Sequence, residues 1–436
     1  MKYVLVGNSF ASIFAAETIR KVDRTGEILM IGEETQRLYS RALIHEYLAG
    51  VVEPSKMYLR EENHYDYLNI ELVAGKRATK LLPDRREVVV EDKAINYDRL
   101  FIGVGGSPFI PPGMDGLDKF PKQVFTFFKF ADAHQLGQLC QKCNNVVVLG
   151  AGLIGVQAAE AFATIKKNVT VIELADYVLP MVCDETAGGI IQSIVEHEGV
   201  KFCLSDSVTE LAGAGGKLKE VRLRSGKVIP ADLFVIAVGV RPNVGWLKDS
   251  GITIDRGLMI DQRTRTSIEN VYAGGDCAQG QELISGSRMV LATIPIAAEM
   301  GTVAGFNMAG MPAEYRGGIP LNALQFGPAQ IISYGYVKEK EGQEVLSVLD
   351  AKNRSYKKLV LEDNRLSGAL FLRAIDRAGL FRYLIEERID VGPFKQKLLS
   401  PDFGPAALPM AIRMKLFGTR QTRVRFPKME LAHNAS

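Results

Sequence analysis

The chain has 436 residues, of which 47% are hydrophobic and 24% are charged, a balance typical of soluble globular proteins. A chain of this length rarely folds around a single core, so about two or three domains are expected. The formal net charge of +3 argues against nucleic acid or an acidic membrane surface as a main partner, and no apolar run is long enough to span a membrane.

The first predicted element is a strand at residues 3–6, followed by a turn and an alanine-rich helix. A strand that starts at Tyr3 leaves no room for a signal peptide, so a cytoplasmic protein is expected. The turn reads Gly7-Asn8-Ser9-Phe10-Ala11-Ser12, with serines where the dinucleotide fingerprint G-x-G-x-x-G has its second and third glycines. A second strand, EILMIGEE, ends in Glu33. The unit is interpreted as a phosphate cradle, and a Rossmann-like unit that binds nothing is the alternative.

The next distinctive feature is a lone CxxC at the end of a predicted helix, formed by Cys140 and Cys143. No second CxxC or nearby histidine completes a zinc set, so the pair is expected to be two thiols at a helix end. Cys183, Cys203 and Cys277 are isolated and are interpreted as packing residues. The sequence therefore predicts neither a metal site nor an iron–sulfur cluster on this chain.

Residues 145–160 repeat the fingerprint in full, with Gly150, Gly152 and Gly155 between a β-branched strand and an alanine-rich helix. The first glycine makes the tight turn, the second admits the pyrophosphate, and the third lets the helix pack on the strand. The free N–H groups at the helix start favour the phosphates. The following strand ends in Glu173, whose carboxylate can accept both adenosine ribose hydroxyls and disfavours the 2′-phosphate of NADP(H). The repeat indicates two dinucleotide sites.

Three later stretches continue the pattern. The stretches at 97–116 and 231–243 each place a glycine after a buried strand, and Asp276 follows a short strand and two glycines. From about residue 313 the chain changes to short strands and then an amphipathic helix at RAGLFRYLIEERI. The tail carries six basic residues and no acid between residues 411 and 428: Arg413, Lys415, Arg420, Arg423, Arg425 and Lys428.

This order of motifs resembles the pyridine nucleotide–disulfide oxidoreductase family over about residues 1–310. The resemblance implies an α/β fold with two Rossmann-like dinucleotide-binding domains, for FAD and NAD, and a C-terminal α+β interface domain. The expected division is an FAD-binding domain at 1–112 and 243–312, a NAD-binding domain at 113–242, and an interface or dimerisation domain with a basic tail at 313–436. A homodimer is expected by the same resemblance.

The resemblance also assigns expected site residues. Glu33 would bind the adenosine ribose of FAD, Asp276 the ribityl chain, and the backbone around Ala78 the adenine. The expected FAD residues are Gly7, Ser9, Phe10, Ala11, Ser12, Glu33, Arg41, Ala78, Gly105, Gly275, Asp276 and Ala297. The expected NAD(H) residues are Gly150, Gly152, Leu153, Ile154, Gly155, Glu173 and Gly239.

Family members that reduce disulfides carry cysteine soon after the first acidic residue, whereas this stretch reads EETQRLYSRALIHEYLAG. It resembles the Tyr-x-Arg-x-x-Leu segment of the branch with rubredoxin and ferredoxin reductases and the nitrite reductase flavin module. Arg41 matches the basic residue of that segment. His45 and Glu46 stand where the branch has Ser and Lys, and Gln157 replaces a glutamate near the flavin and nicotinamide. Arg41, His45 and Gln157 are the candidate catalytic residues.

The expected function is an FAD-dependent NADH oxidoreductase that passes electrons between NAD(H) and a ferredoxin- or rubredoxin-like iron–sulfur carrier. The flavin suits this exchange because it handles electrons in pairs or singly. A peroxide-forming NADH oxidase and a flavoprotein subunit or redox-sensing binding protein of a larger complex are the alternatives. The basic tail is interpreted either as a solvated end or as a docking arm for an acidic carrier.

Overall fold

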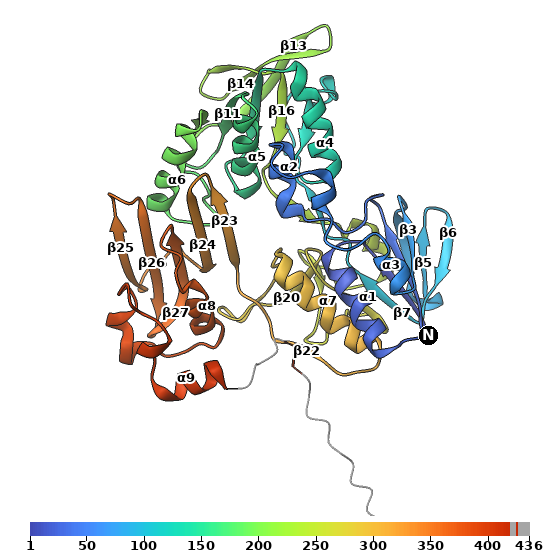
Figure 1. Ribbon diagram of the computed structural model, residues 1–436. Coiled ribbons are helices and arrows are strands. Elements are labelled where there is room, and N and C mark those ends of the chain that lie inside the picture. Colours follow the sequence, from blue (N-terminus) through green and yellow to red (C-terminus); the bar gives the residue numbers. More distant parts are fainter. Residues whose placement is uncertain (419–423, 426–436) are drawn as a thin grey trace, which may run out of the picture.

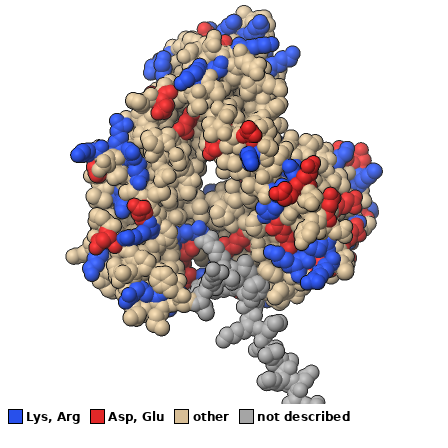
Figure 2. Space-filling view, in the orientation of Figure 1, with Lys and Arg blue, Asp and Glu red and all other residues tan. Residues whose placement is uncertain are grey.

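The computed structural model describes residues 1–418 and 424–425, which form three units (Figure 1). The space-filling view shows a hollow between them (Figure 2). The first unit is built on a five-stranded parallel sheet in the order β19-β7-β1-β2-β3. Its strands are β1 (Lys2–Val6), β2 (Glu27–Gly32), β3 (Ile70–Ala74), β7 (Arg99–Ile102) and β19 (Val271–Ala273). Strand β19 reaches this sheet from far along the sequence, so the unit draws on two separate stretches of chain.

Helices α1 (Phe10–Val22) and α7 (Ile294–Met308) lie side by side against this sheet (Figure 1). Small residues allow their close approach: a Cβ at Gly301 would lie 2.0 Å from the Ala11 carbonyl oxygen, and one at Gly305 would lie 2.5 Å from that of Ala15. The close packing brings the middle of α7 beside the start of α1. Shorter elements complete the unit: α3 (His64–Tyr67), β4 (Ala78–Leu82), β5 (Glu87–Val90), β6 (Lys93–Asn96), β18 (Leu258–Met259), β20 (Ala278–Gln281), β21 (Arg288–Met289) and β22 (Glu314–Tyr315).

The second unit repeats the plan of the first. Its parallel sheet has the order β12-β11-β10-β16-β9, with helices α4 (Phe130–Leu139), α5 (Leu153–Thr164) and α6 (Glu185–His197). The strands are β9 (Val124–Thr126), β10 (Asn145–Leu149), β11 (Asn168–Ile172), β12 (Val200–Cys203) and β16 (Leu233–Ile236). A separate antiparallel sheet of β13 (Val208–Ala214), β14 (Lys217–Leu223) and β15 (Val228–Pro230) stands beside it.

Two crossings of the chain join the first and second units. Strands β8 (Gly106–Pro108) and β17 (Val240–Pro242) pair antiparallel. The segment that leads into the second unit and the segment that returns to the first therefore lie side by side. Helix α2 (Ile44–Leu48) of the first unit packs on α4 and α5 of the second (Figure 1). Its Ile44 and Leu48 belong to the same buried cluster as Leu136. The start of the chain therefore contributes to the core of the second unit.

The third unit is an antiparallel sheet in the order β23-β24-β27-β26-β25, with α8 (Ala378–Glu386) against β27 and β24. The strands are β23 (Leu321–Phe326), β24 (Ala329–Gly335), β25 (Glu344–Asp350), β26 (Ser355–Glu362) and β27 (Arg365–Leu372). The face near α6 carries Ile331 and Leu372, which share a buried cluster with residues of the second unit. Lys358 on β26 reaches Asp184, the N-cap residue of α6, with Nζ 3.0 Å from its Oδ2.

Near its end the chain forms α9 (Met410–Phe417) and β28 (Val424–Arg425), whose backbone pairs with β22. Arg413 and Lys415 lie on α9, whereas Arg420, Arg423 and Lys428 lie outside the described residues. The docking arm therefore stays a prediction.

The two fingerprint-bearing parallel sheets and the C-terminal α+β unit confirm the predicted fold class. Among residues 1–418 and 424–425, no helix is both long and apolar enough to cross a bilayer. In the same part of the chain, no group of three His, Cys, Asp or Glu side chains is arranged to hold a metal ion.

Candidate functional site

A deep cleft opens in the first unit at the carboxyl ends of β1 and β2 and holds about 1400 Å³ of empty space, its open mouth included. This is the edge of a parallel sheet at which dinucleotides bind. The lining residues come from all parts of the first unit and from one loop of the second. They are Val6–Ala11, Ile31–Glu34, Arg41, Lys76–Ala78, Gly103–Gly106, Phe128, Lys129, Asn243, Trp246, Gly275, Asp276, Ala292–Ile294 and Ala297.

The floor of the cleft is the turn between β1 and α1. Gly7 has a φ of +119°, and a Cβ there would lie 2.2 Å from the Gly103 carbonyl oxygen, so no other residue fits. Ser9 is the N-cap residue of α1, and its side chain bonds to none of the free helix amides. The first turn of α1 carries no acidic residue. Free N–H groups and a free hydroxyl at a helix start are suited to phosphate oxygens.

Ser12 occupies the third glycine position of the fingerprint and does not line the cleft. It is fully buried, and a Cβ at Gly103 would lie only 2.4 Å from its hydroxyl oxygen. That oxygen has no hydrogen-bond partner among the described residues. Ser12 therefore packs α1 against the sheet, and the structure does not bring it to a bound ligand.

The part of the cleft wall formed by Asp276 and the start of α7 carries polar groups that have no protein partner in the described structure. Asp276 follows Gly275, which has a φ of +76°, and its carboxylate accepts no hydrogen bond from the described residues. Burial raises the pKa of Asp276, and the charge of Arg41 across the cleft opposes that rise. The buried hydroxyl of Thr293, at the start of α7, is also unpartnered. Hydroxyl and amide groups of a bound dinucleotide would satisfy both residues, so the cleft fits FAD.

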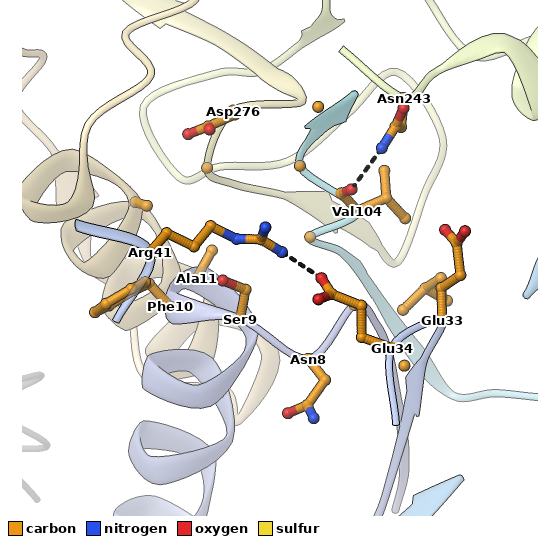
Figure 3. A pocket seen from close by; sticks show the side chains of 18 of the residues that line it. Asn8, Ser9, Phe10, Ala11, Glu33, Glu34, Arg41, Val104, Asn243 and Asp276 are labelled. Atoms are coloured by element: carbon orange, nitrogen blue, oxygen red, sulfur yellow. Dashed lines mark hydrogen bonds and ion pairs between the residues drawn. The ribbon is translucent and has the colours of Figure 1, made fainter. Parts of the chain in front are cut away.

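One rim of the cleft is tied to the second unit. The guanidinium of Arg41 forms an ion pair with Glu34 (Figure 3), and it also donates to the Phe128 carbonyl oxygen at 3.1 Å. Glu33, which is half exposed, lies 3.5 Å from the Lys129 ammonium. The sequence did not indicate Glu34, Phe128 or Lys129. Glu34 stands beside the predicted Glu33, but nothing local shows that the loop at 127–130 returns to this cleft.

The second fingerprint has the geometry of a phosphate-binding turn. A Cβ at Gly150 would lie 2.6 Å from the Ala237 carbonyl oxygen, and one at Gly155 would lie 1.9 Å from that of Gly150. By contrast, nothing lies within 4 Å of a Cβ at Gly152 or Gly239, so the backbone there is open to a ligand. Leu153 and Ile154 begin α5. Within the fingerprint, Gly150 and Gly155 are therefore required for packing, whereas Gly152 faces open space.

Glu173 closes the second fingerprint unit. Its carboxylate accepts the Ala151 amide at 2.6 Å and the Ala175 amide at 2.9 Å. These two bonds hold the acid against the phosphate turn, where a nucleotide ribose would lie. Leu174 beside it is 67% exposed, which leaves an apolar surface next to the acid.

The structure does not bring all three candidate catalytic residues together. Arg41 lines the cleft, whereas His45 on α2 and Gln157 on α5 do not. Burial lowers the pKa of His45, which favours its neutral form. The roles of His45 and Gln157 stay predictions.

The thiols lie away from the cleft. No cysteine is among the described residues that line it, and all five are free. Cys140 and Cys143 are buried in the core of the second unit. Cys277 follows Asp276, but it is fully buried and its Sγ lies 3.4 Å from the carbonyl oxygens of Ile102 and Gly274. The described structure therefore provides no thiol route to a ligand in the cleft.

An FAD cleft without a cysteine among its described lining residues, next to a second dinucleotide-binding unit, defines a flavin-dependent oxidoreductase that uses a nicotinamide nucleotide. The chain belongs to the pyridine nucleotide–disulphide oxidoreductase family, which residues 1–301 match. Residues 320–389 match the rubredoxin NAD+ reductase C-terminal domain. These matches confirm the predicted family, its FAD and NAD(H) cofactors and its oxidoreductase activity.

Named relatives cover most of the chain. The assimilatory nitrate reductase electron transfer subunit of Bacillus subtilis (strain 168) is 30% identical over 92% of this chain and 51% of its own length. The NADH-dependent phenylglyoxylate dehydrogenase subunit epsilon of Aromatoleum evansii is 30% identical over 92% of this chain and 94% of its own. The rubredoxin-NAD(+) reductase of Pseudomonas putida is 29% identical over 67% and 76%. The chain thus spans about half the length of the first relative and nearly all of the second.

The fold agrees with solved structures. The covalent putidaredoxin reductase–putidaredoxin complex matches with a TM-score of 0.83 and 23% identity, covering 90% of this chain and 94% of that one.

Proposed function

We propose that this protein passes electrons between NAD(H) and an iron–sulfur carrier of the ferredoxin or rubredoxin type. The observation that carries the proposal is the FAD cleft without a cysteine among its described lining residues. A dithiol relay needs a thiolate beside the flavin. Its absence favours direct exchange between the flavin and an external acceptor or donor. The C-terminal match to a rubredoxin reductase domain supports the same class of partner.

The chain's own residues bind and align the reactants. Gly7, Ser9 and the start of α1 hold the phosphates of FAD, Glu33 its ribose and Asp276 its ribityl chain. Gly152 and the start of α5 hold the phosphates of NAD(H), and Glu173 its ribose. Bound FAD supplies the redox chemistry, since it exchanges electron pairs with the nicotinamide and single electrons with a carrier. Alignment of the two rings is the main contribution of the protein.

The second candidate function is that of a subunit in a larger redox enzyme. It is favoured by two relatives that are themselves named as subunits and that cover 92% of this chain. We propose the domain division at 112/113, 242/243 and 312/313, a homodimer, and a cytoplasmic location as further parts of this account.

The proposal is tested by carrier reduction without oxygen. NADH, the purified protein and either a ferredoxin or a rubredoxin are mixed, and bleaching of the carrier's visible absorbance is recorded. We expect one carrier to be reduced at a rate well above that of free FAD. If neither carrier is reduced, and a parallel aerated sample of protein and NADH rapidly forms peroxide, the protein is an oxidase and the proposal is wrong.

A further inference from the structure

The feature of interest is the set of contacts that fixes Arg41 at the mouth of the FAD cleft. Its guanidinium forms an ion pair with Glu34 and donates to the Phe128 carbonyl oxygen at 3.1 Å. It also lies 4.9 Å from the centre of the Phe128 ring and 5.2 Å from that of Tyr39. The cation is therefore held from several sides.

Glu34 is itself held in place. The Tyr39 hydroxyl donates to its second carboxylate oxygen at 2.7 Å and accepts the Phe130 amide at 3.1 Å. Tyr39 is only 5% exposed. A hydrogen-bonded chain thus runs from the backbone of the second unit, through Tyr39 and Glu34, to the guanidinium of Arg41.

The ion pair leaves most of the guanidinium free for a ligand. An arginine has five N–H donors, and the bonds to Glu34 and Phe128 occupy one each. Figure 3 shows the guanidinium reaching across the cleft above Ser9, at the start of α1. The remaining donors lie where the phosphates of a dinucleotide meet the helix start.

We propose that Glu34 is a positioning residue for FAD binding, because it holds Arg41 in the orientation that its free N–H groups need to reach the phosphates. The inference rests on the FAD site of the proposed function, but not on the identity of the electron carrier. The opposite possibility is that Glu34 competes with the phosphates for Arg41. The two possibilities differ in the sign of the effect on FAD affinity.

The experiment is a double-mutant cycle on FAD release. Trp246, the only tryptophan in the chain, lines the cleft, so its fluorescence reports bound FAD. Holoprotein is diluted in steps, and the dissociation constant is measured for the wild type, Glu34→Gln, Arg41→Gln and the double variant. We expect about tenfold weaker binding in each single variant, as for one charge-assisted bond. The double variant should bind no more weakly than Arg41→Gln alone, because Glu34 acts through Arg41.

Glu17→Gln is the matched control. Glu17 pairs with Arg60 at 2.7 Å and with His64 at 3.0 Å, and it does not line the cleft. Its loss should leave FAD affinity unchanged in both the wild-type and the Arg41→Gln background. If Glu34→Gln does not fold, Tyr39→Phe tests the same hydrogen-bonded chain, because it removes the hydroxyl that holds Glu34. We expect FAD to bind about threefold more weakly to Tyr39→Phe, and we expect no such effect in the Arg41→Gln background. The proposal would be overturned if Glu34→Gln bound FAD more tightly than the wild type. It would also be overturned if the two single-variant decreases in FAD affinity added up in the double variant.

Discussion

At the scale of single residues, the FAD cleft combines glycines that no other residue can replace with polar groups that the protein leaves unpaired. The turn at Gly7 and the acid Glu33 follow from a local pattern of strand, glycine and acid, so the sequence predicts them, whereas the expected role of Asp276 comes from the family resemblance. Glu34, Phe128 and Lys129 were missed because their place at the cleft depends on a contact between two units. Ser12 was assigned to FAD, but its buried position makes it a packing residue.

Asp276 predicts a pH dependence in the FAD-free protein. Burial raises its pKa above the ordinary value of 3.8. Because the folded state then holds the proton more tightly than the unfolded state, this residue lowers stability as pH rises from about 4 through the raised pKa. Asp276→Asn should therefore melt at a higher temperature than the wild type at pH 7, with the difference shrinking toward pH 4. Thermal unfolding at both pH values checks this, and a difference that does not change with pH would contradict it.

Glu173 predicts a preference for NADH over NADPH. A 2′-phosphate about 4 Å from its carboxylate would cost about 1–4 kcal/mol, or roughly one to three decades in affinity. Residues 174–180 contain no lysine or arginine to offset that repulsion. Glu173→Gln should reduce the preference for NADH over NADPH at least tenfold. The amide oxygen of the glutamine can still accept a hydrogen bond from one of the two backbone amides of the turn. Stopped-flow flavin reduction with both nucleotides measures it, and equal rates in the wild type would refute the assignment.

At the scale of elements, the two fingerprint units were predictable because strand, turn, helix and acid are contiguous in the sequence. The contacts that join the third unit to the second were not, because they link residues far apart in the chain. Lys358 on β26 is an example: its side chain is 5% exposed and pairs with Asp184 and Glu339. Nothing in the sequence around Lys358 indicates a partner on α6.

Lys358→Met should destabilise the protein by about 2–3 kcal/mol, since it leaves the largely buried Asp184 without its cation. The loss stays below the full cost of a buried charge because the Tyr356 hydroxyl and the Ala187 amide still bond to Asp184, at 2.9 and 3.1 Å. Lys395→Met, which breaks a more exposed pair with Glu344, should cost only about 0–1 kcal/mol. Urea unfolding measures the free energy of unfolding of the two variants. Equal decreases would show that the buried ion pair contributes no more to stability than the exposed one.

The basic tail can be tested by truncation, and the packing of helix α9 determines which residues can be removed without damage to the third unit. Ile412 and Leu416 pack against the core of the third unit, so a cut before Arg413 would damage that unit. Removing residues 419–436 spares α9 and deletes Arg420, Arg423, Arg425 and Lys428. If the tail docks an acidic carrier, ferredoxin-linked turnover should slow and lose most of its salt dependence, while ferricyanide reduction survives.

Unchanged ferredoxin kinetics after this cut would show that the tail is only a solvated end. A dimer that dissociates would instead place the tail at the subunit interface. Kinetics at two salt concentrations and the mass in solution distinguish the three results.

At the scale of the whole molecule, the proposed route for electrons runs from NAD(H) on the second unit to FAD on the first, with no cysteine among the described residues that line the FAD cleft. The alternative route of the wider family would pass through a disulfide. The CxxC at Cys140 and Cys143 is buried in the second unit, and neither residue lines the FAD cleft. The number of electrons that the protein accepts distinguishes the two routes.

The most direct test is an anaerobic titration of the purified yellow protein with NADH, followed by the visible absorbance of the flavin and by thiol counting. The account predicts that one equivalent of NADH per FAD bleaches the flavin completely and leaves the number of free thiols unchanged. The cofactor released by acid should be FAD. A second equivalent of NADH consumed together with the appearance of two new thiols would contradict the account, as would a flavin that NADH does not reduce.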